Sequence, residues 1–124
     1  MNIEKSIDTI LKVLEDNKAL DVIVFEVSKL TSISDYMIIA SGRSSRQVNS
    51  ISEKVTEAAK ENGLVLLGTE GKKEGDWVLV DLGDIIVHIM HPDTREYYQL
   101  EKLWSSVTIE AEQAEQAEKA EKGQ

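Results

Sequence analysis

Two segments place apolar side chains at the three- and four-residue spacing of an amphipathic helix. The first begins near the start of the chain and is predicted to end near Asn17, and the second is stopped by Gly63. Ser44, followed three residues later by Gln47, is typical of a capping box that opens the second helix. The apolar positions are Ile3, Ile7, Ile10, Leu11 and Leu14 in the first helix and Val48, Ile51, Val55, Ala58 and Ala59 in the second.

Shorter apolar runs predict strands. The runs Val22–Val27 and Tyr36–Ala40 are almost continuously apolar, which indicates strands covered on both faces near the middle of a sheet. They frame a loop at Ser28–Asp35. A further strand is predicted at Leu64–Leu67, parallel to the run at Tyr36 because a helix connects them. The Gly-rich and charged segment Gly68–Gly75 is predicted to be an exposed loop.

The stretch Asp76–His91 predicts an antiparallel hairpin, because two runs rich in β-branched residues flank a turn that contains Gly. If Val80 pairs with Ile85, one face of the hairpin is aliphatic and the other is chemically mixed. In the alternative register Val80 pairs with Asp84, and Trp77 joins the aliphatic face. The first register separates apolar from polar side chains more cleanly and is preferred. Its faces are Val78, Val80, Ile85, Val87 and Ile89 on one side, and Trp77, Leu79, Asp81, Asp84, Ile86, His88 and Met90 on the other.

A last helix is predicted after Pro92, with Asp93 and Glu96 placed to cap it. Its apolar stripe is expected to pack on the sheet. The order of elements is helix, two strands, helix, three strands, helix. This order predicts the α/β (α+β) class, with a mixed sheet of about five strands and helices packed on it. The stripe consists of Tyr97, Leu100, Leu103 and Trp104.

The C-terminal segment has a different composition. From Ile109 onward Ala recurs every three residues with Glu behind it, and this spacing forms no fixed apolar face on a helix. We therefore predict one folded domain at residues 1–107 and a charged Ala/Glu-rich tail at residues 108–124, as a fraying helix or a disordered segment.

Composition narrows the class of protein. The 124 residues are enough for one domain with a core, and the chain has no Cys, which excludes disulfides and thiolate metal sites. No targeting peptide and no membrane span are visible, so a cytoplasmic protein is expected. The net charge is −9, and the segment from residue 106 contributes −3 of it. An acidic body repels phosphate backbones, which argues against nucleic-acid binding as the main source of affinity and suits a basic protein partner.

Candidate catalytic patterns are weak. The Ser41-Gly42 turn before a helix could hold an anion and resembles the corresponding turn of nucleotidyltransferases, but no P-loop or dinucleotide fingerprint is present. The strand after that helix lacks the two alternating acids that a nucleotidyltransferase needs. Asp81 and Asp84 lie at a turn, where Asp is common for local reasons, so a magnesium site is disfavoured there. We predict no catalytic residues, no metal and no cofactor.

A resemblance to a known family rests on several segments in matching order and spacing. From about Ile3 to Trp104 the chain resembles the ribosomal silencing factor family, also called iojap-like. Two departures are mild: Leu82 stands where many members have an aromatic residue, and Met90 where Phe is frequent. The segments are Asp35–Gly42, Ser44–Gln47, Glu70-Gly71, Asp76–His88, Arg95, Tyr97-Tyr98 and Leu100–Trp104.

The resemblance implies a protein without enzymatic activity. Family members bind the large ribosomal subunit through large-subunit protein fourteen, block joining of the small subunit, and repress translation when nutrients are short. The implied fold is related to the nucleotidyltransferase fold without its catalytic acids. We expect Trp77 to anchor the partner as an aromatic hot spot, unless the hairpin register makes it a core residue. The other expected partner-binding residues are the acids Glu70, Asp81 and Asp84, with Leu82, His88 and Met90 completing the surface.

Two alternatives remain open from the sequence. The first is a nucleotide-binding or nucleotidyltransferase-like enzyme that uses the Ser41-Gly42 turn. The second is a symmetric homodimer in which the mixed face of the hairpin meets its own copy. Saturable stabilisation by ATP and magnesium would favour the enzyme, and light scattering would identify the dimer.

Overall fold

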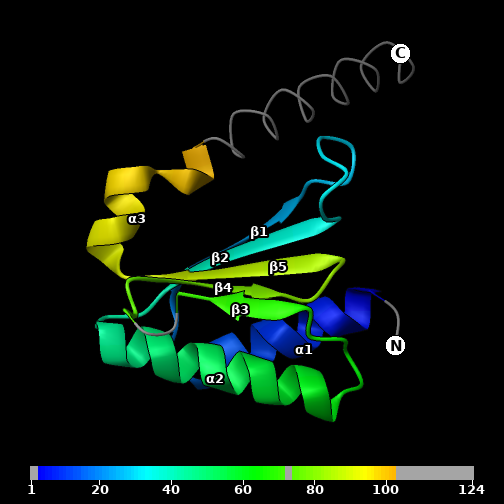
Figure 1. Cartoon of the computed structure of the whole chain (residues 1–124), viewed down its shortest axis with the longest axis horizontal. Helices are drawn as coiled ribbons and strands as arrows, with labels where there is room; N and C mark the ends of the chain where they lie inside the picture. Colours follow the sequence, from blue (N-terminus) through cyan, green and yellow to red (C-terminus); the bar gives the residue numbers. More distant parts are fainter. Residues whose placement is uncertain (1–2, 72–73, 103–124) are drawn as a thin grey trace, which may run out of the picture.

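The computed structural model describes residues 3–71 and 74–102. These residues form a mixed five-stranded sheet in the order β1-β2-β5-β4-β3, with helices packed on it (Figure 1). The predicted α/β class and mixed sheet of about five strands are confirmed. The elements are α1 (Ile3–Asp16), β1 (Leu20–Glu26), β2 (Tyr36–Ser41), α2 (Ser45–Glu61), β3 (Gly68–Glu70), β4 (Trp77–Asp81), β5 (Ile85–Met90) and α3 (Pro92–Tyr98).

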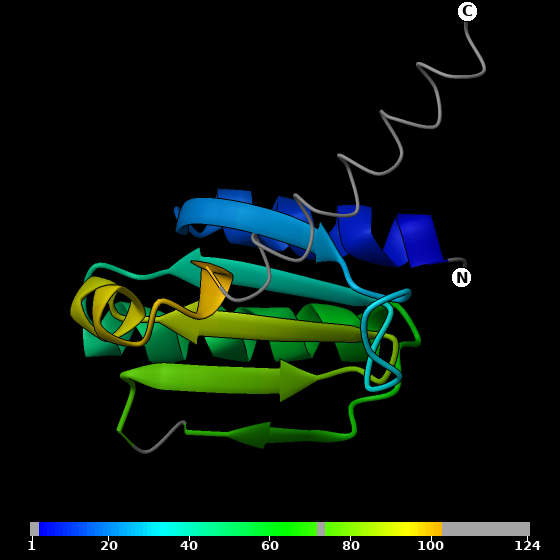
Figure 2. The ribbon, with the colours of Figure 1, turned by 90° about the horizontal axis from the view of Figure 1, so that it is seen from above.

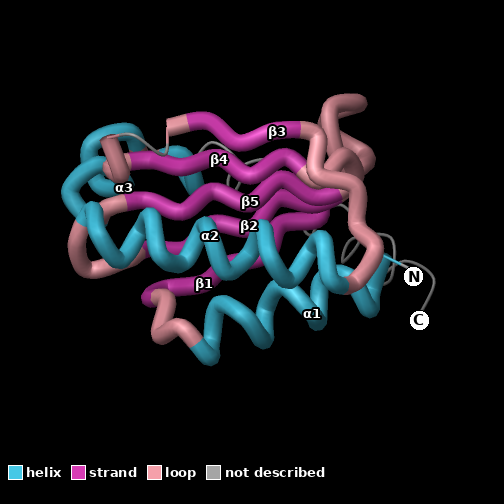
Figure 3. The backbone as a smooth tube through the Cα atoms, turned by 60° about the horizontal axis from the view of Figure 1, so that its bottom comes forward, coloured by secondary structure: helices cyan, strands magenta, loops and turns pink. Residues whose placement is uncertain are grey.

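The helices divide unequally between the two faces of the sheet. Helices α1 and α2 run along one face (Figure 3), while the short α3 lies at one end of the opposite face, beyond the end of β5 (Figures 1 and 2). We call this opposite face the outer face. Its side chains include Met37 and Ile39 of β2, Trp77 and Leu79 of β4, and Ile86, His88 and Met90 of β5.

The main core lies between the sheet and helices α1 and α2. Ile10 and Leu14 of α1 and Val48, Ile51 and Val55 of α2 are buried there. These residues keep the helical spacing of the sequence, so each helix presents one apolar stripe to the sheet. Each fully buried aliphatic side chain stabilises the fold by about 1.5–3 kcal/mol. The sheet contributes Ile38, Ala40, Val78, Val80, Ile85, Val87 and Ile89 to the same core.

The hairpin of β4 and β5 has the predicted faces but a different pairing. Val80 pairs with Val87, two residues further along than the predicted partner, Ile85. The difference arises because the hairpin closes at Leu82, whose N–H donates to Ile85 O at 2.9 Å, and Gly83 turns the chain with φ +83°. A shift of two residues preserves which side chains share a face. The alternative register, with Trp77 among the aliphatic residues, is therefore wrong.

The sheet corrects two strand predictions. β2 is central, but β1 is an edge strand and not a strand covered on both faces. Its pairing with β2 is also interrupted between Leu20 and Ile23, where Asp21 adopts φ +49°.

The third strand begins at Gly68 and not at Leu64, because β4 ends at Asp81, opposite Gly68. The burial of residues 64–67 alternates as in a strand, and Leu67 N donates to Asp81 O at 2.8 Å, but the ladder with β4 begins only at Gly68. β2 and β3 are parallel, as predicted, with β5 and β4 between them.

The last helix also differs in detail. His91 and not Asp93 is its N-cap, with Nδ1 of His91 accepting from Asp93 N at 3.2 Å and Pro92 in the first turn. The helix ends at Tyr98, and its C-cap, Gln99, adopts φ +50°. Tyr97 is 80% exposed, so it does not pack on the sheet as the predicted apolar stripe requires. Leu103, Trp104 and the predicted tail lie outside the described residues. No helix in the described part of the chain has the length and hydropathy required to span a bilayer.

Candidate partner-binding site

Trp77 lies at the start of β4 on the outer face, where it is half-buried. One side of the indole packs on a small apolar cluster that is separate from the main core, and Leu100 packs on the same cluster. The burial of one side fixes the ring, and the exposed remainder is available to a partner. The buried members of the cluster are Phe25, Val27, Met37, Ile39 and Met90.

His88 holds the indole from the neighbouring strand. Nε1 of Trp77 donates to Nδ1 of His88 at 2.9 Å, and the two rings are 5.8 Å apart. His88 is only 5% exposed, and this burial lowers its pKa from 6.5 to about 4. The imidazole is therefore neutral at physiological pH, which is the form whose Nδ1 can accept a hydrogen bond. The indole N–H is occupied inside the protein, so the exposed part of Trp77 presents its ring.

Two further side chains extend the exposed surface of Trp77. The Tyr98 ring from α3 lies 5.2 Å from the Trp77 ring at an interplanar angle of 52°, and it is 58% exposed. Leu79 lies two residues along β4 on the same face and is partly exposed. We call Trp77, Leu79 and Tyr98 the Trp77 platform. Rings at this separation attract each other, so the platform is an ordered apolar surface.

Acidic residues surround the platform. A hollow of about 290 Å³ is lined by Glu70, Gly71, Trp77 and Leu79, and a second of about 280 Å³ by Gly71, Glu74, Asp76, Trp77, Thr94 and Tyr98. Glu70, Glu74 and Asp76 are exposed. An apolar centre with an acidic rim suits a partner that offers an apolar or aromatic group flanked by Lys or Arg.

Gly71 shapes the chain next to the platform. It adopts φ +87°, and a Cβ at this position would lie 2.0 Å from the carbonyl oxygen of Trp77. Glycine tolerates this conformation because it has no Cβ. The close approach brings the segment after β3 against the start of β4, and so contributes to the position of Trp77.

We expect Gly71→Ala to lower the free energy of unfolding by about 1–2 kcal/mol, because Ala is strained at positive φ and its Cβ would displace the backbone of Trp77. Urea denaturation measures the loss. Gly68→Ala is the matched control, since nothing lies within 4 Å of its Cβ and its φ is ordinary. Equal stability of the two variants would contradict the role given to Gly71.

The structure brings together four of the seven predicted partner-binding residues. Glu70, Trp77, His88 and Met90 lie at the Trp77 end of the outer face, since Glu70 pairs with Leu79 and Met90 with Trp77. His88 and Met90 are buried, at 5% and 0% exposure, so here they support Trp77 from below and offer no contact surface of their own. Their part in partner binding stays a prediction, and at this burial it would be exerted through the position of Trp77.

The other three predicted residues lie at the far end of the hairpin. Asp81 is four residues from Trp77 along β4, and its Oδ1 accepts from Gly83 N at 2.9 Å, as Asp commonly does in a turn. Asp84 is exposed, and its carbonyl oxygen accepts from Asp35 N, Tyr36 N and Ser34 Oγ. Leu82 packs with the main core at 9% exposure, away from the outer face, and its part in partner binding stays a prediction.

Sequence reasoning missed Tyr98 and the role of Leu79. Leu79 could have been found, because it is two residues from Trp77 and must share its face. Tyr98 depends on how α3 ends and where it lies against β4, and no local pattern specifies that contact.

Several backbone amides of the Ser41-Gly42 turn and the start of α2 are hydrogen-bonded within the chain. Gly42 N donates to Met90 O at 3.1 Å, Arg43 N to Gln47 Oε1 at 2.6 Å, and Gln47 N to Ser44 Oγ at 3.1 Å. These amides are among those that an anion at the start of α2 would use. Among residues 3–71 and 74–102, no three His, Asp or Glu side chains are grouped so that they could hold a metal ion.

Comparison with known proteins gives a consistent result. A family model described as "Ribosomal silencing factor during starvation" matches residues 1–124. The chain is 44% identical over 104 residues to a protein of Chromobacterium violaceum named ribosomal silencing factor RsfS, covering 84% of this chain and 85% of that protein. It is 40% identical over 95 residues to the protein of the same name from Bacillus subtilis, covering 77% and 80%. These proteins are named as silencing factors and not as enzymes.

The fold agrees with a solved structure. A crystal structure of a protein from Chromobacterium violaceum superposes with a TM-score of 0.83 at 44% sequence identity, covering 85% of this chain and 88% of that chain.

Proposed function

Because the chain belongs to the ribosomal silencing factor family, we propose that it binds the large ribosomal subunit through large-subunit protein fourteen and blocks joining of the small subunit. Translation would be repressed in this way when nutrients are limited. The protein would act in the cytoplasm, where the subunits join. Occlusion requires binding alone, so no catalytic group, metal or cofactor is needed.

The observation that carries the proposal is the Trp77 platform with its acidic rim. Trp and Tyr dominate the energetic centres of protein interfaces, because they bury much area at a small cost in side-chain entropy. Trp77 is already oriented by its hydrogen bond to His88, so its side chain loses little conformational entropy on binding. Glu70, Glu74 and Asp76 outnumber Lys72 and Lys73 between them in the sequence, which leaves a small excess of the charge that attracts a basic ribosomal protein. In this proposal Asp81 and Asp84 lie at the edge of the contact.

Sedimentation with separated ribosomal subunits tests the proposal. We expect the purified chain to co-sediment with isolated large subunits and not with small subunits, and to reduce the yield of whole ribosomes when both subunits are mixed. Light scattering of the protein alone checks that the platform is not already buried in a homodimer, which would have to open before docking. Binding confined to small subunits, or an unchanged yield of whole ribosomes, would refute the mechanism.

A further inference from the structure

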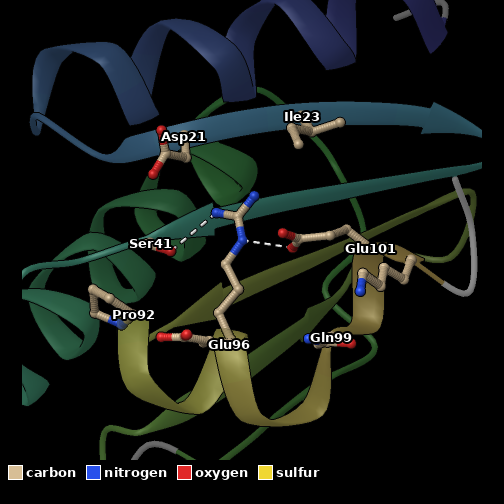
Figure 4. A pocket seen from close by; sticks show the side chains of 9 residues that line it. Asp21, Ile23, Ser41, Pro92, Glu96, Gln99 and Glu101 are labelled. Carbon is tan, nitrogen blue, oxygen red and sulfur yellow. Dashed lines mark hydrogen bonds and ion pairs between the residues drawn. The ribbon is translucent and has the colours of Figure 1, made fainter.

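A buried arginine connects α3 to the centre of the sheet. Arg95 is 7% exposed; its Nη1 donates to Oγ of Ser41 at 3.0 Å, and its Nε donates to Oε2 of Glu101 at 2.6 Å. In Figure 4 the dashed lines mark these two bonds, which end on the labelled Ser41 and Glu101, and Asp21 and Ile23 of β1 border the same pocket. The three side chains line a cavity of about 430 Å³ together with Asp21 and Ile23 of β1 and Pro92 of α3.

Besides Arg95, the contacts that hold helix α3 are the bond from His91 N to Asp76 O at 2.8 Å, the packing of Leu100 just after the helix, and the Tyr98 ring on Trp77. The helix spans seven residues, and Arg95 is its only buried residue within the described part of the chain. Helices this short are not stable alone in water, so α3 depends on contacts made by its side chains and ends. The His91 cap fixes its start, and the left-handed Gln99 reverses the chain at its end. Arg95 is the side chain that reaches from the helix into the sheet.

The position of α3 decides where Tyr98 lies. Tyr98 follows Arg95 by three residues, so the two side chains are neighbours on the helix surface. Displacement of the helix would carry the Tyr98 ring away from Trp77, 5.2 Å from it. We propose that Arg95, held by Ser41 and Glu101, is a positioning residue that completes the Trp77 platform by placing Tyr98 beside Trp77. This inference rests on the proposed function insofar as it concerns the ribosome.

The chemistry of the contact requires arginine. A planar guanidinium offers donors in fixed directions, so Arg95 can bond Ser41 on β2 and Glu101 beyond α3 at the same time. A Lys ammonium is a compact charge and does not reproduce this fork. Glu101 compensates the buried charge, which would otherwise be costly. The Ser41-Gly42 turn, which resembles an anion-binding turn in sequence, thus serves to hold a helix.

A double-mutant cycle with Tyr98 tests the inference. The affinity of the full chain for isolated large subunits is measured for the unchanged protein, Arg95→Gln, Tyr98→Ala and the double variant. We expect Arg95→Gln to weaken binding by about tenfold in the unchanged background and by less than about twofold in the Tyr98→Ala background. Lys54→Gln on α2, which removes an exposed charge paired with Glu57, is the matched control and should change nothing. Tenfold weakening in both backgrounds, or none in either, would overturn the positioning role.

Two further measurements test the role of Arg95 if Arg95→Gln does not fold or if the unchanged protein does not bind large subunits. If Arg95→Gln does not fold, Ser41→Ala removes one acceptor only and should give the same non-additivity with a smaller effect. Near-ultraviolet circular dichroism of the free protein reports the contact of the Trp77 and Tyr98 rings, and Arg95→Gln should lose the same signal that Tyr98→Ala loses. An unchanged spectrum in Arg95→Gln would overturn the inference even if the unchanged protein binds large subunits. Absence of binding by the unchanged protein would refute the proposed function, while the spectral test would still decide the role of Arg95.

Discussion

Trp77→Ala is expected to weaken binding to the large subunit by more than about 2 kcal/mol, roughly thirtyfold in the dissociation constant. The substitution removes the central ring of the platform and leaves Tyr98 without its neighbour. It also removes the donor to His88 Nδ1. Affinity is measured by titrating labelled protein against isolated large subunits, and far-ultraviolet circular dichroism checks that the fold is retained.

Two control variants sharpen the expectation for Trp77. Trp77→Phe loses the N–H bond to His88 and part of the ring area but keeps an aromatic face, so it should bind more tightly than Trp77→Ala. Ile33→Ala removes another exposed apolar side chain, 75% exposed in the loop before β2, and should leave affinity unchanged. A folded Trp77→Ala protein that binds as well as the unchanged chain would show that the platform is not the docking surface.

Acid is expected to destabilise the fold through His88. Its folded pKa of about 4 lies below the ordinary value of 6.5, so the folded protein favours the neutral imidazole. The contribution of neutral His88 to the free energy of unfolding is fully present above pH 6.5. It is lost as the pH falls from 6.5 to about 4, and it does not change further at lower pH. The displacement of the pKa corresponds to about 3 kcal/mol of unfolding free energy. Urea denaturation at a series of pH values measures the loss.

His88→Asn separates this effect from the titration of carboxylates. The amide oxygen of Asn can accept from Trp77 Nε1 much as Nδ1 does, but Asn does not titrate. We expect the variant to lose about 3 kcal/mol less than the unchanged protein between pH 6.5 and 4. Parallel curves for the unchanged protein and His88→Asn would exclude His88 as the source of acid sensitivity.

Local patterns predicted the parts of the fold that depend on nearby residues. The capping sequence at Ser44 and the aliphatic face of the hairpin, Val78 to Ile89, are confirmed because spacing along the chain decides them. The position of β1 at the edge could not be predicted in this way. A nearly continuous apolar run is compatible with the centre or the edge of a sheet, and the choice depends on which strands pair with it.

In the candidate site, too, local patterns predicted what nearby residues decide and not what distant contacts decide. Trp77 and Glu70 belong together because strand pairing places them on one face, and the hairpin pattern placed Trp77 correctly. Burial of Met90 could not be foreseen, since it comes from packing with Leu100 and with residues of β1 and β2 such as Phe25 and Met37, and strand pairing and the path of the chain after α3 decide those contacts. The relation to the nucleotidyltransferase fold, the homodimer and the boundary at residue 107 stay predictions.

The irregular edge strand β1 has a consequence for self-association. An open edge with Ile23 and Val24 each 38% exposed could serve as a template for a strand from another chain, which is how many sheet proteins aggregate. Here the left-handed Asp21 breaks the ladder between Leu20 and Ile23, and Glu26 adds a second exposed acid at the other end. A docking strand would meet an interrupted row of donors and two negative charges. These features oppose the pairing of β1 with a strand from another chain.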